Sequence, residues 1–293
     1  MTNDTTRTAW IALSLIPNLG GRTLRRLLDQ FESPPAVLEA GDAALRAVHG
    51  VGPKLSTAIR AIDLDAVQAA ITAWQADGIT ISLVGDPAYP APLAALDDAP
   101  PTLFLRGALA ADASSIWDKS IAIIGTRRPR PESAEIARAL AAAFAAQGWL
   151  VVSGLAAGID AAAHAGACAA GRTAAVLGCG VRAIYPTENH DLAARILAQG
   201  VLLSETHPDA PPSSPALVAR NRLISGLSRA VIVIETGLTG GSLHTVRFAR
   251  VQRRPVYAIA DDAPGNQQLI AEGAIPLAPT PADWKRLQKL LEG

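Results

Sequence analysis

Six short apolar segments alternate with helix-like segments between residues 120 and 260, and this alternation leaves the chain few possible architectures. Within each segment the hydrophobic residues run on without alternating with polar ones, which is typical of strands covered on both faces. Strands and helices that alternate in this way form an open, doubly wound, parallel sheet, so we predict an α/β fold. The six segments read IAIIGT, WLVVSG, RTAAVLGCG, VLLSE, AVIVIE and PVYAIA.

Two stretches near the N-terminus share a helical pattern. Leu13–Phe31 and Leu45–Ile62 each contain an apolar stretch, a glycine-bearing turn and an amphipathic helix. The pattern resembles tandem helix-hairpin-helix or SAM-like elements, whose turn amides can hold a phosphate. The segment is net acidic, however, which favours a helical packing or dimerisation role. We assign residues 1–68 to this all-α domain and residues 69–293 to the sheet domain.

A proline-rich stretch, residues 78–107, leads from the helical domain into the sheet domain. It carries two predicted short strands, Ile79–Val84 and Thr102–Arg106, separated by turn-forming prolines. We expect a connecting region here.

The composition indicates a soluble globular protein. Hydrophobic residues make up 49% of the chain and charged residues 18%. No apolar run approaches the roughly 18 residues that a membrane span needs, and the N-terminus lacks a signal-peptide pattern. We therefore expect a cytoplasmic protein without a membrane partner.

Two cysteines, Cys168 and Cys179, are too few for a disulfide framework, and we expect both to be buried, reduced thiols.

Charge is segregated along the chain although the net charge is zero. Residues 1–112 sum to −4, residues 113–260 to +6 and residues 261–293 to −2. In the middle segment, 14 of the 15 cations are arginine, whose planar guanidinium binds phosphate in a bidentate manner. The segment is either a phosphate-binding region or the solvated surface of an arginine-rich protein.

Glycine and polar residues follow the predicted strands. Because the carboxyl ends of parallel strands meet at one edge of the sheet, these residues are expected to form one ligand-binding rim. Backbone amides at glycines and helix N-termini favour anions there. Arg127, Arg128, Arg220 and Arg222 lie nearby in the topology, so we predict anion binding. The strand ends are Gly125-Thr126-Arg127-Arg128, Ser153-Gly154 with Gly158 and Asp160, Gly178-Cys179-Gly180, Ser204-Glu205, and Glu235-Thr236-Gly237.

Catalytic alternatives have less support. Asp160 and His164 are four residues apart on one predicted helix face, but no third partner completes a triad. A buried, satisfied His164 that orients Asp160 and the neighbouring loop is the favoured interpretation. The chain has no GxSxG, HExxH, CxxC or GxGxxG motif in the required context. We expect no catalytic residue, no metal site and no cofactor.

Several motifs in the same order resemble the DprA (Smf) family of DNA-processing proteins. The resemblance covers about residues 10–280. It implies a SAM-like domain followed by an extended Rossmann-like domain, single-stranded DNA binding, homodimerisation, and delivery of the recombinase RecA onto incoming DNA in natural transformation. The motifs are Gly125-Thr126-Arg127, SGLAAGIDAAAH (Ser153–His164), AVLGCGVRAIYP (Ala175–Pro186), LLSE (Leu202–Glu205), ARNRLISGLS (Ala219–Ser228), VIVIET, GGSLHT (Gly240–Thr245) and PGNQQLIAEGA (Pro264–Ala274).

The resemblance also implies a set of DNA-binding residues. Arg127 falls at the family's phosphate-contacting arginine, and the RNR motif contributes charge and an amide to the same pocket. Two positions depart from the family pattern, Ala157 where many members carry Lys and Leu217 where they carry Phe, and the chain ends before a winged-helix domain would begin. The predicted residues are Gly125, Thr126, Arg127, Ser153, Gly154, Gly158, Arg220, Asn221, Arg222, Gly241 and Ser242.

The sequence is compatible with three functions. The leading hypothesis is a non-enzymatic, dimeric, single-stranded DNA-binding recombination mediator. A nucleotide-ligand sensor or LOG-like nucleotide hydrolase is the second, although such hydrolases need a PGGxGTxxE glutamate and no acid lies between Thr236 and Ala260. A dimeric adaptor with a degenerate DNA site is the third. The sequence leaves the dimer surface, the RecA-docking surface and the competence of the host undetermined.

Overall fold

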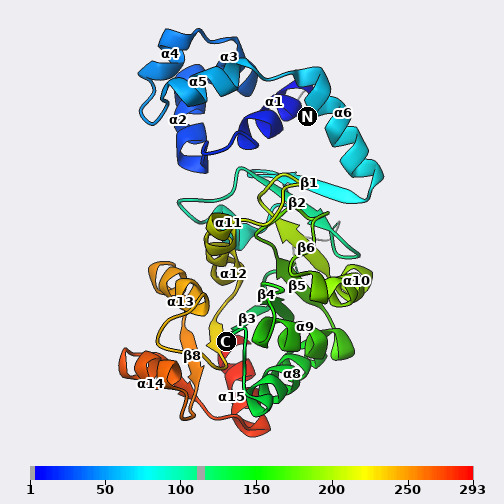
Figure 1. The fold of residues 1–293 in the computed structure, drawn as a ribbon, viewed down its shortest axis with the longest axis vertical. Helices are drawn as coiled ribbons and strands as arrows, with labels where there is room; N and C mark the ends of the chain where they lie inside the picture. Colours follow the sequence, from blue (N-terminus) through cyan, green and yellow to red (C-terminus); the bar gives the residue numbers. More distant parts are fainter. Residues whose placement is uncertain (1–3, 111–115, 293) are drawn as a thin grey trace.

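A mixed sheet of nine strands forms the centre of the described part of the chain, in a computed structural model that describes residues 4–110 and 116–292 (Figure 1). The strand order is β1-β2-β6-β5-β4-β3-β7-β8-β9. Neighbouring strands from β6 through to β9 are parallel, whereas β2 is antiparallel to β6 and to β1. The strands are β1 (Ile79–Leu83), β2 (Thr102–Arg106), β3 (Ser120–Ile124), β4 (Leu150–Ser153), β5 (Thr173–Val176), β6 (Val201–Ser204), β7 (Val231–Val233), β8 (Val256–Ile259) and β9 (Ile275–Leu277).

Helices cover both faces of this sheet, which confirms the predicted doubly wound α/β architecture. On β3, Ala122 and Ile124 pack into the core beneath α12, α13 and α14. Ile121 and Ile123 face the opposite core, beneath α8, α9 and α15. The helices of this part are α7 (Ala91–Ala94), α8 (Pro131–Ala146), α9 (Ile159–Ala170), the 3-10 helix η1 (Thr187–Asn189), α10 (His190–Gln199), α11 (Ser214–Ala219), α12 (Asn221–Leu227), α13 (Ser242–Val251), α14 (Pro264–Ala271) and α15 (Pro281–Glu292).

The six predicted parallel strands are confirmed, and the sheet extends beyond them at both edges. β1 and β2, expected to lie in a connecting region, continue the sheet past β6, where Phe104 pairs with Ser204. β9 pairs with β8 at the other edge. It has three residues, of which Ile275 and Pro276 are exposed, so no apolar run marks it in the sequence.

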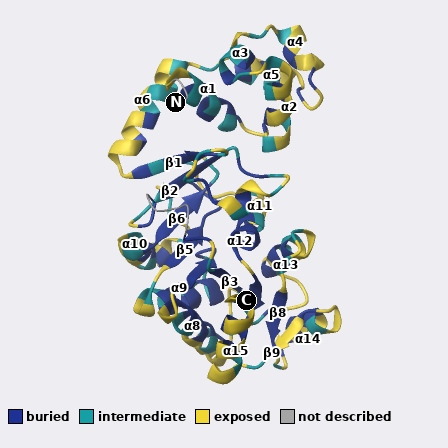
Figure 2. Cartoon of the chain, turned by 180° about the vertical axis from the view of Figure 1, so that it is seen from behind, coloured by how far each residue is buried: buried dark blue, intermediate teal, exposed yellow. Residues whose placement is uncertain are grey.

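The N-terminal part is helical, as predicted, and has a core of its own. Figure 2 shows buried residues on the inward faces of its short helices. Leu13, Leu24, Leu27, Leu45 and Ile59 are almost completely buried against one another. The helices are α1 (Asp4–Ser14), α2 (Gly21–Phe31), α3 (Pro34–Glu39), α4 (Asp42–Ala47), α5 (Pro53–Arg60) and α6 (Leu64–Ala76).

Helix α6 joins the helical part to the sheet, and the boundary expected after residue 68 falls inside it. Its Trp74 packs edge-on against Phe104 of β2, with ring centroids 5.6 Å apart. Trp10 of α1 donates a hydrogen bond from Nε1 to the Pro101 carbonyl at 3.0 Å. The apolar face of α6 therefore continues the sheet's core, which is why a change in composition does not mark the end of the helical part.

Candidate nucleic-acid interface

A cavity of about 510 Å³ opens at the carboxyl ends of the parallel strands. Its walls come from the segment after β3, the glycine-rich loop after β7, and the first turns of α12 and α13. β3 and β7 are neighbours in the sheet, and the chain moves outward from them in opposite directions, to β4 and to β8. This is the topological switch point, where open α/β sheets bind ligands.

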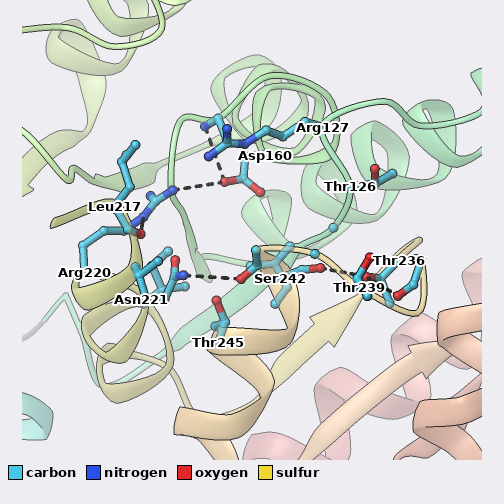
Figure 3. A pocket seen from close by; sticks show the side chains of 18 of the residues that line it. Thr126, Arg127, Asp160, Leu217, Arg220, Asn221, Thr236, Thr239, Ser242 and Thr245 are labelled. Atoms are coloured by element: carbon cyan, nitrogen blue, oxygen red, sulfur yellow. Dashed lines mark hydrogen bonds and ion pairs between the residues drawn. The ribbon is translucent and has the colours of Figure 1, made fainter. Parts of the chain in front are cut away.

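Arg220 forms the cavity floor, and the interior of the protein holds it in place (Figure 3). Its Nη1 donates to the Val176 carbonyl at 2.6 Å and its Nε to the Leu217 carbonyl at 3.3 Å. Its Nη2 lies 4.0 Å from Oδ2 of Asp160. Burial lowers the pKa of Arg220, and Asp160 opposes that shift. All three nitrogens of this guanidinium therefore face partners within the protein: two donate hydrogen bonds to carbonyls and the third forms an ion pair with Asp160.

Asp160 organises the loop after β4. Its Oδ2 accepts hydrogen bonds from the backbone N–H groups of Gly154 (3.1 Å) and Ala156 (3.4 Å). Burial raises the pKa of Asp160, while Arg220 and these donors oppose the rise. A Cβ on Gly154 would lie 1.6 Å from Nη1 of Arg220, so this position has room only for glycine beside the buried pair.

His164 is a buried, fully bonded side chain, as the favoured interpretation expected. Its Nε2 accepts the Leu155 N–H at 3.3 Å, and its Nδ1 lies 2.7 Å from Oγ1 of Thr173. Since Thr173 donates its own proton to the Val151 carbonyl, Nδ1 carries the hydrogen and the ring is neutral. Burial, and secondarily Arg220, lowers the pKa of His164 to about 3. The ring thus bonds the loop itself at Leu155, whereas no hydrogen bond joins it to Asp160 in the described part of the chain, so the expectation that His164 orients Asp160 is not met.

Arg127 and Arg128 supply the free charge at the cavity mouth. Both are exposed and line the cavity, and within the described part of the chain neither side chain makes an ion pair or a hydrogen bond. Arg130, three residues after Arg127, differs sharply, because it pairs with Asp261 and Glu235. The two arginines at the mouth therefore remain available to an anion.

Hydroxyl groups and a helix N-terminus form the opposite wall. Thr236 and Ser242 hydrogen-bond through their hydroxyls at 2.8 Å, and Asn221 donates to the Gly241 carbonyl at 3.4 Å. Thr245 is buried in the first turn of α13 and also lines the cavity (Figure 3). The positive end of the α13 dipole thus faces the same space as the two free arginines.

The cavity gathers most of the predicted site residues, but not all of them. Ser153 is buried and donates to the Ile123 carbonyl at 2.7 Å, and Gly158 lies against the backbone of Thr126. Gly154 lines a smaller adjoining cavity of about 110 Å³. The predicted residues that line the larger cavity are Gly125, Thr126, Arg127, Arg220, Asn221, Gly241 and Ser242.

The expectation that Arg222 shares this pocket is wrong. Arg222 pairs instead with Glu205 and with Asp98, whose Oδ2 is 3.3 Å from its Nε. Residues two apart on a helix point roughly 200° away from each other. Arg220 and Arg222 therefore cannot serve one pocket, although they are close in the sequence.

Cys179 is buried as predicted, but Cys168 is only half-buried; both are free thiols.

Sequence reasoning missed Tyr185, Thr239 and Thr245, which line the large cavity. The hydroxyl-rich run around GGSLHT was a signal for the threonines, whereas nothing in the sequence distinguished the exposure of Tyr185.

Comparison with known proteins identifies the family. The sequence model of the family described as DNA recombination-mediator protein A matches residues 80–286 of this chain. The chain belongs to this family. Protein Smf from a Synechocystis species is 34% identical over 97% of this chain and 76% of its own length.

Two solved structures of DNA processing protein A are similar to this family member. The one from Streptococcus pneumoniae has a TM-score of 0.78 at 28% identity and covers 97% of both chains. The other comes from Helicobacter pylori and was described for its single-stranded DNA binding mode. It has a TM-score of 0.63 at 30% identity, and the match covers 73% of this chain and 96% of that one. Among the described residues, no helix is long and apolar enough to span a membrane.

Proposed function

We propose that this family member is a recombination mediator that binds single-stranded DNA at the cavity beyond β3 and β7. The observation that carries the proposal is the pair of exposed guanidinium groups, Arg127 and Arg128, which make no ion pair or hydrogen bond with the described residues and lie beside the N-terminus of α13. Cations and a helix N-terminus around one concave site bind phosphate oxygens without reading base identity. The single-stranded DNA binding of the Helicobacter pylori protein supports the same ligand here.

The finer parts of the proposal follow from the family. The protein acts in the cytoplasm as a homodimer and delivers RecA onto incoming DNA in natural transformation. It does so without catalysis. Asp160 and His164, the polar pair nearest to a catalytic arrangement, are both occupied by structural hydrogen bonds, which supports a binding role rather than a chemical one.

The DNA-binding proposal is tested by salt titration with single-stranded and duplex oligonucleotides. Wild-type protein should prefer the single strand, with log affinity falling steeply against log salt. Arg127→Glu should weaken binding by at least tenfold and lower the slope by about one. Arg195→Glu makes the same charge change on an exposed face of α10 and should bind like wild type. Equal affinity of Arg127→Glu and wild type at every salt concentration would contradict the placement of the DNA.

The partner proposals need separate measurements. Sedimentation should give a mass twice that of the 30.3 kDa chain. Adding the protein should shorten the lag before RecA filaments form on single-stranded DNA. A monomer, or an unchanged lag, would remove the corresponding part of the proposal and leave DNA binding standing.

A nucleotide-ligand sensor is the second candidate function, favoured by the cavity's volume and its hydroxyl-rich wall. Incubation with nucleoside monophosphates separates the candidates. Tight binding of a monophosphate without affinity for oligonucleotides would favour the sensor, and release of free base would reveal a hydrolase.

A further inference from the structure

Tyr185 is unusual among the aromatic residues of this chain. The chain has twelve of them, and all lie in the described part. Eleven are buried or half-buried, whereas Tyr185 is 38% exposed. An isolated exposed apolar side chain needs no explanation by itself. Tyr185, however, is exposed at the candidate interface, where it lines the cavity.

The ring of Tyr185 lies between the two cavities. It lines both the cavity of about 510 Å³ and the adjoining one of about 110 Å³. Arg127, Leu217 and Arg220 also line both, so the two cavities adjoin at these side chains and together form one groove. The exposed aromatic surface of Tyr185 and the exposed guanidinium of Arg127 therefore line the same groove.

The backbone that carries Tyr185 is held firmly on the body of the sheet. Ile184, the preceding residue, packs against a hydrophobic core. On the other side, Asn189 donates from its backbone N–H to the Pro186 carbonyl at 3.1 Å and from Nδ2 to the Leu155 carbonyl at 2.9 Å. The ring thus projects from a fixed segment, so a ligand that stacks on it pays little ordering entropy.

We propose that Tyr185 is the stacking platform for one unpaired nucleobase of the bound strand. This inference rests on the proposed function. In a nucleotide the base is tied through the sugar to the phosphate, so a phosphate held at Arg127 brings its base into the groove that Tyr185 lines. The side chain of Leu217, which lines both cavities as well, adds an apolar surface to the groove. Stacking of this kind tolerates any base, because every base has a π face.

The test compares two single-stranded oligonucleotides of equal length and charge. One is oligothymidylate and the other carries abasic sugars throughout, so that the two strands differ only in the presence of the bases. Wild-type protein should bind the thymidylate more tightly. Tyr185→Leu should weaken binding of the thymidylate by about tenfold and leave the abasic strand unaffected. Tyr185→Phe keeps the ring and should restore the preference.

A second measurement reports stacking directly. An oligonucleotide with one 2-aminopurine should lose fluorescence on binding to wild type and to Tyr185→Phe, but not to Tyr185→Leu. Thermal unfolding of Tyr185→Leu checks that the variant folds. If wild type binds neither oligonucleotide, the proposed function fails and this inference fails with it. If Tyr185→Leu binds thymidylate as wild type does, DNA binding stands and the stacking assignment is overturned.

Discussion

Arg220 and Asp160 form a buried pair directly beneath the candidate interface, with Nη2 and Oδ2 4.0 Å apart and side chains only 6% and 8% exposed. Arg127, above them, is exposed and unpaired within the described part of the chain. Positive charge at the site is therefore divided between two tasks. Arg220 maintains the shape of the cavity floor, and Arg127 is free to meet an anion. The two arginines should respond differently to substitution.

Arg220→Met should destabilise the fold. The change leaves Asp160 as a buried, uncompensated charge and removes the donors to the Val176 and Leu217 carbonyls. Loss of one partner from a buried pair costs about 3 kcal/mol. Urea unfolding at neutral pH measures this loss. Arg127→Met is the matched control and should lie within about 0.5 kcal/mol of wild type, as expected for an exposed residue. Equal stability of the two variants would show that the buried pair contributes nothing to the fold.

Stability should fall in acid partly through His164. Its pKa in the folded protein is about 3, against 6.5 for the unfolded chain. Because the unfolded chain takes up the proton first, the contribution of neutral His164 is complete above about pH 6.5. It is lost progressively as the pH falls toward 3. Each pH unit within that window lowers the free energy of unfolding by about 1.4 kcal/mol. The free energy of unfolding should therefore be about 2 kcal/mol lower at pH 5 than at pH 7.

His164→Gln isolates this contribution, because glutamine does not titrate. The variant should be less stable than wild type at pH 7 but should lose less stability between pH 7 and pH 5. Urea titrations of both proteins at the two pH values give the comparison. A variant whose stability falls with pH as steeply as that of wild type would assign the acid sensitivity to other groups.

Gly158→Ala should be far more disruptive than an alanine at another left-handed glycine. Gly158 has φ +81°, and a Cβ there would lie 2.5 Å from the Thr126 carbonyl oxygen, which is backbone and cannot move aside. Gly85 also has a positive φ, +97°, but a Cβ there meets nothing within 4 Å. Gly85→Ala should cost about 1 kcal/mol of stability from backbone strain alone. Gly158→Ala should cost at least 2 kcal/mol more because of the clash. Thermal unfolding of the two variants checks the difference.

Much of the architecture was predictable because the parallel strands are continuous apolar runs. That pattern located the six strands of the parallel sheet, and the topology then placed Gly125, Arg127 and Thr236 at one rim without coordinates. β9 was not predictable, since a three-residue edge strand with exposed residues has no such pattern. The junction at α6 was also missed, because the face of a helix that covers a distant strand is not marked by nearby residues.

The limits at the site have a different cause. Sequence reasoning identifies charged residues near a strand end but not the partners that neutralise them. Asp98, which engages Arg222, comes from a proline-rich region more than a hundred residues away. The exposure of Tyr185 likewise depends on how its segment packs on the core. The residue types predicted that anion-binding groups lie at the ends of the strands. Which of those groups have no carboxylate partner is decided by the packing of distant segments.

Arg222 lies outside the cavity and should act through its carboxylate partners. Arg222 forms an ion pair with the half-buried Glu205. Burial raises the pKa of Glu205, and Arg222 opposes that rise. Arg222→Met should cost about 3 kcal/mol, because it strips the counter-ion from Glu205. Adding Glu205→Gln removes the stranded charge, so the double variant should be more stable than the sum of the single losses predicts, by about 1 kcal/mol or more. Urea unfolding of the four proteins completes the cycle. Additive losses would show that Arg222 and Glu205 are not coupled, and would make Arg222 available again for a direct role in DNA binding.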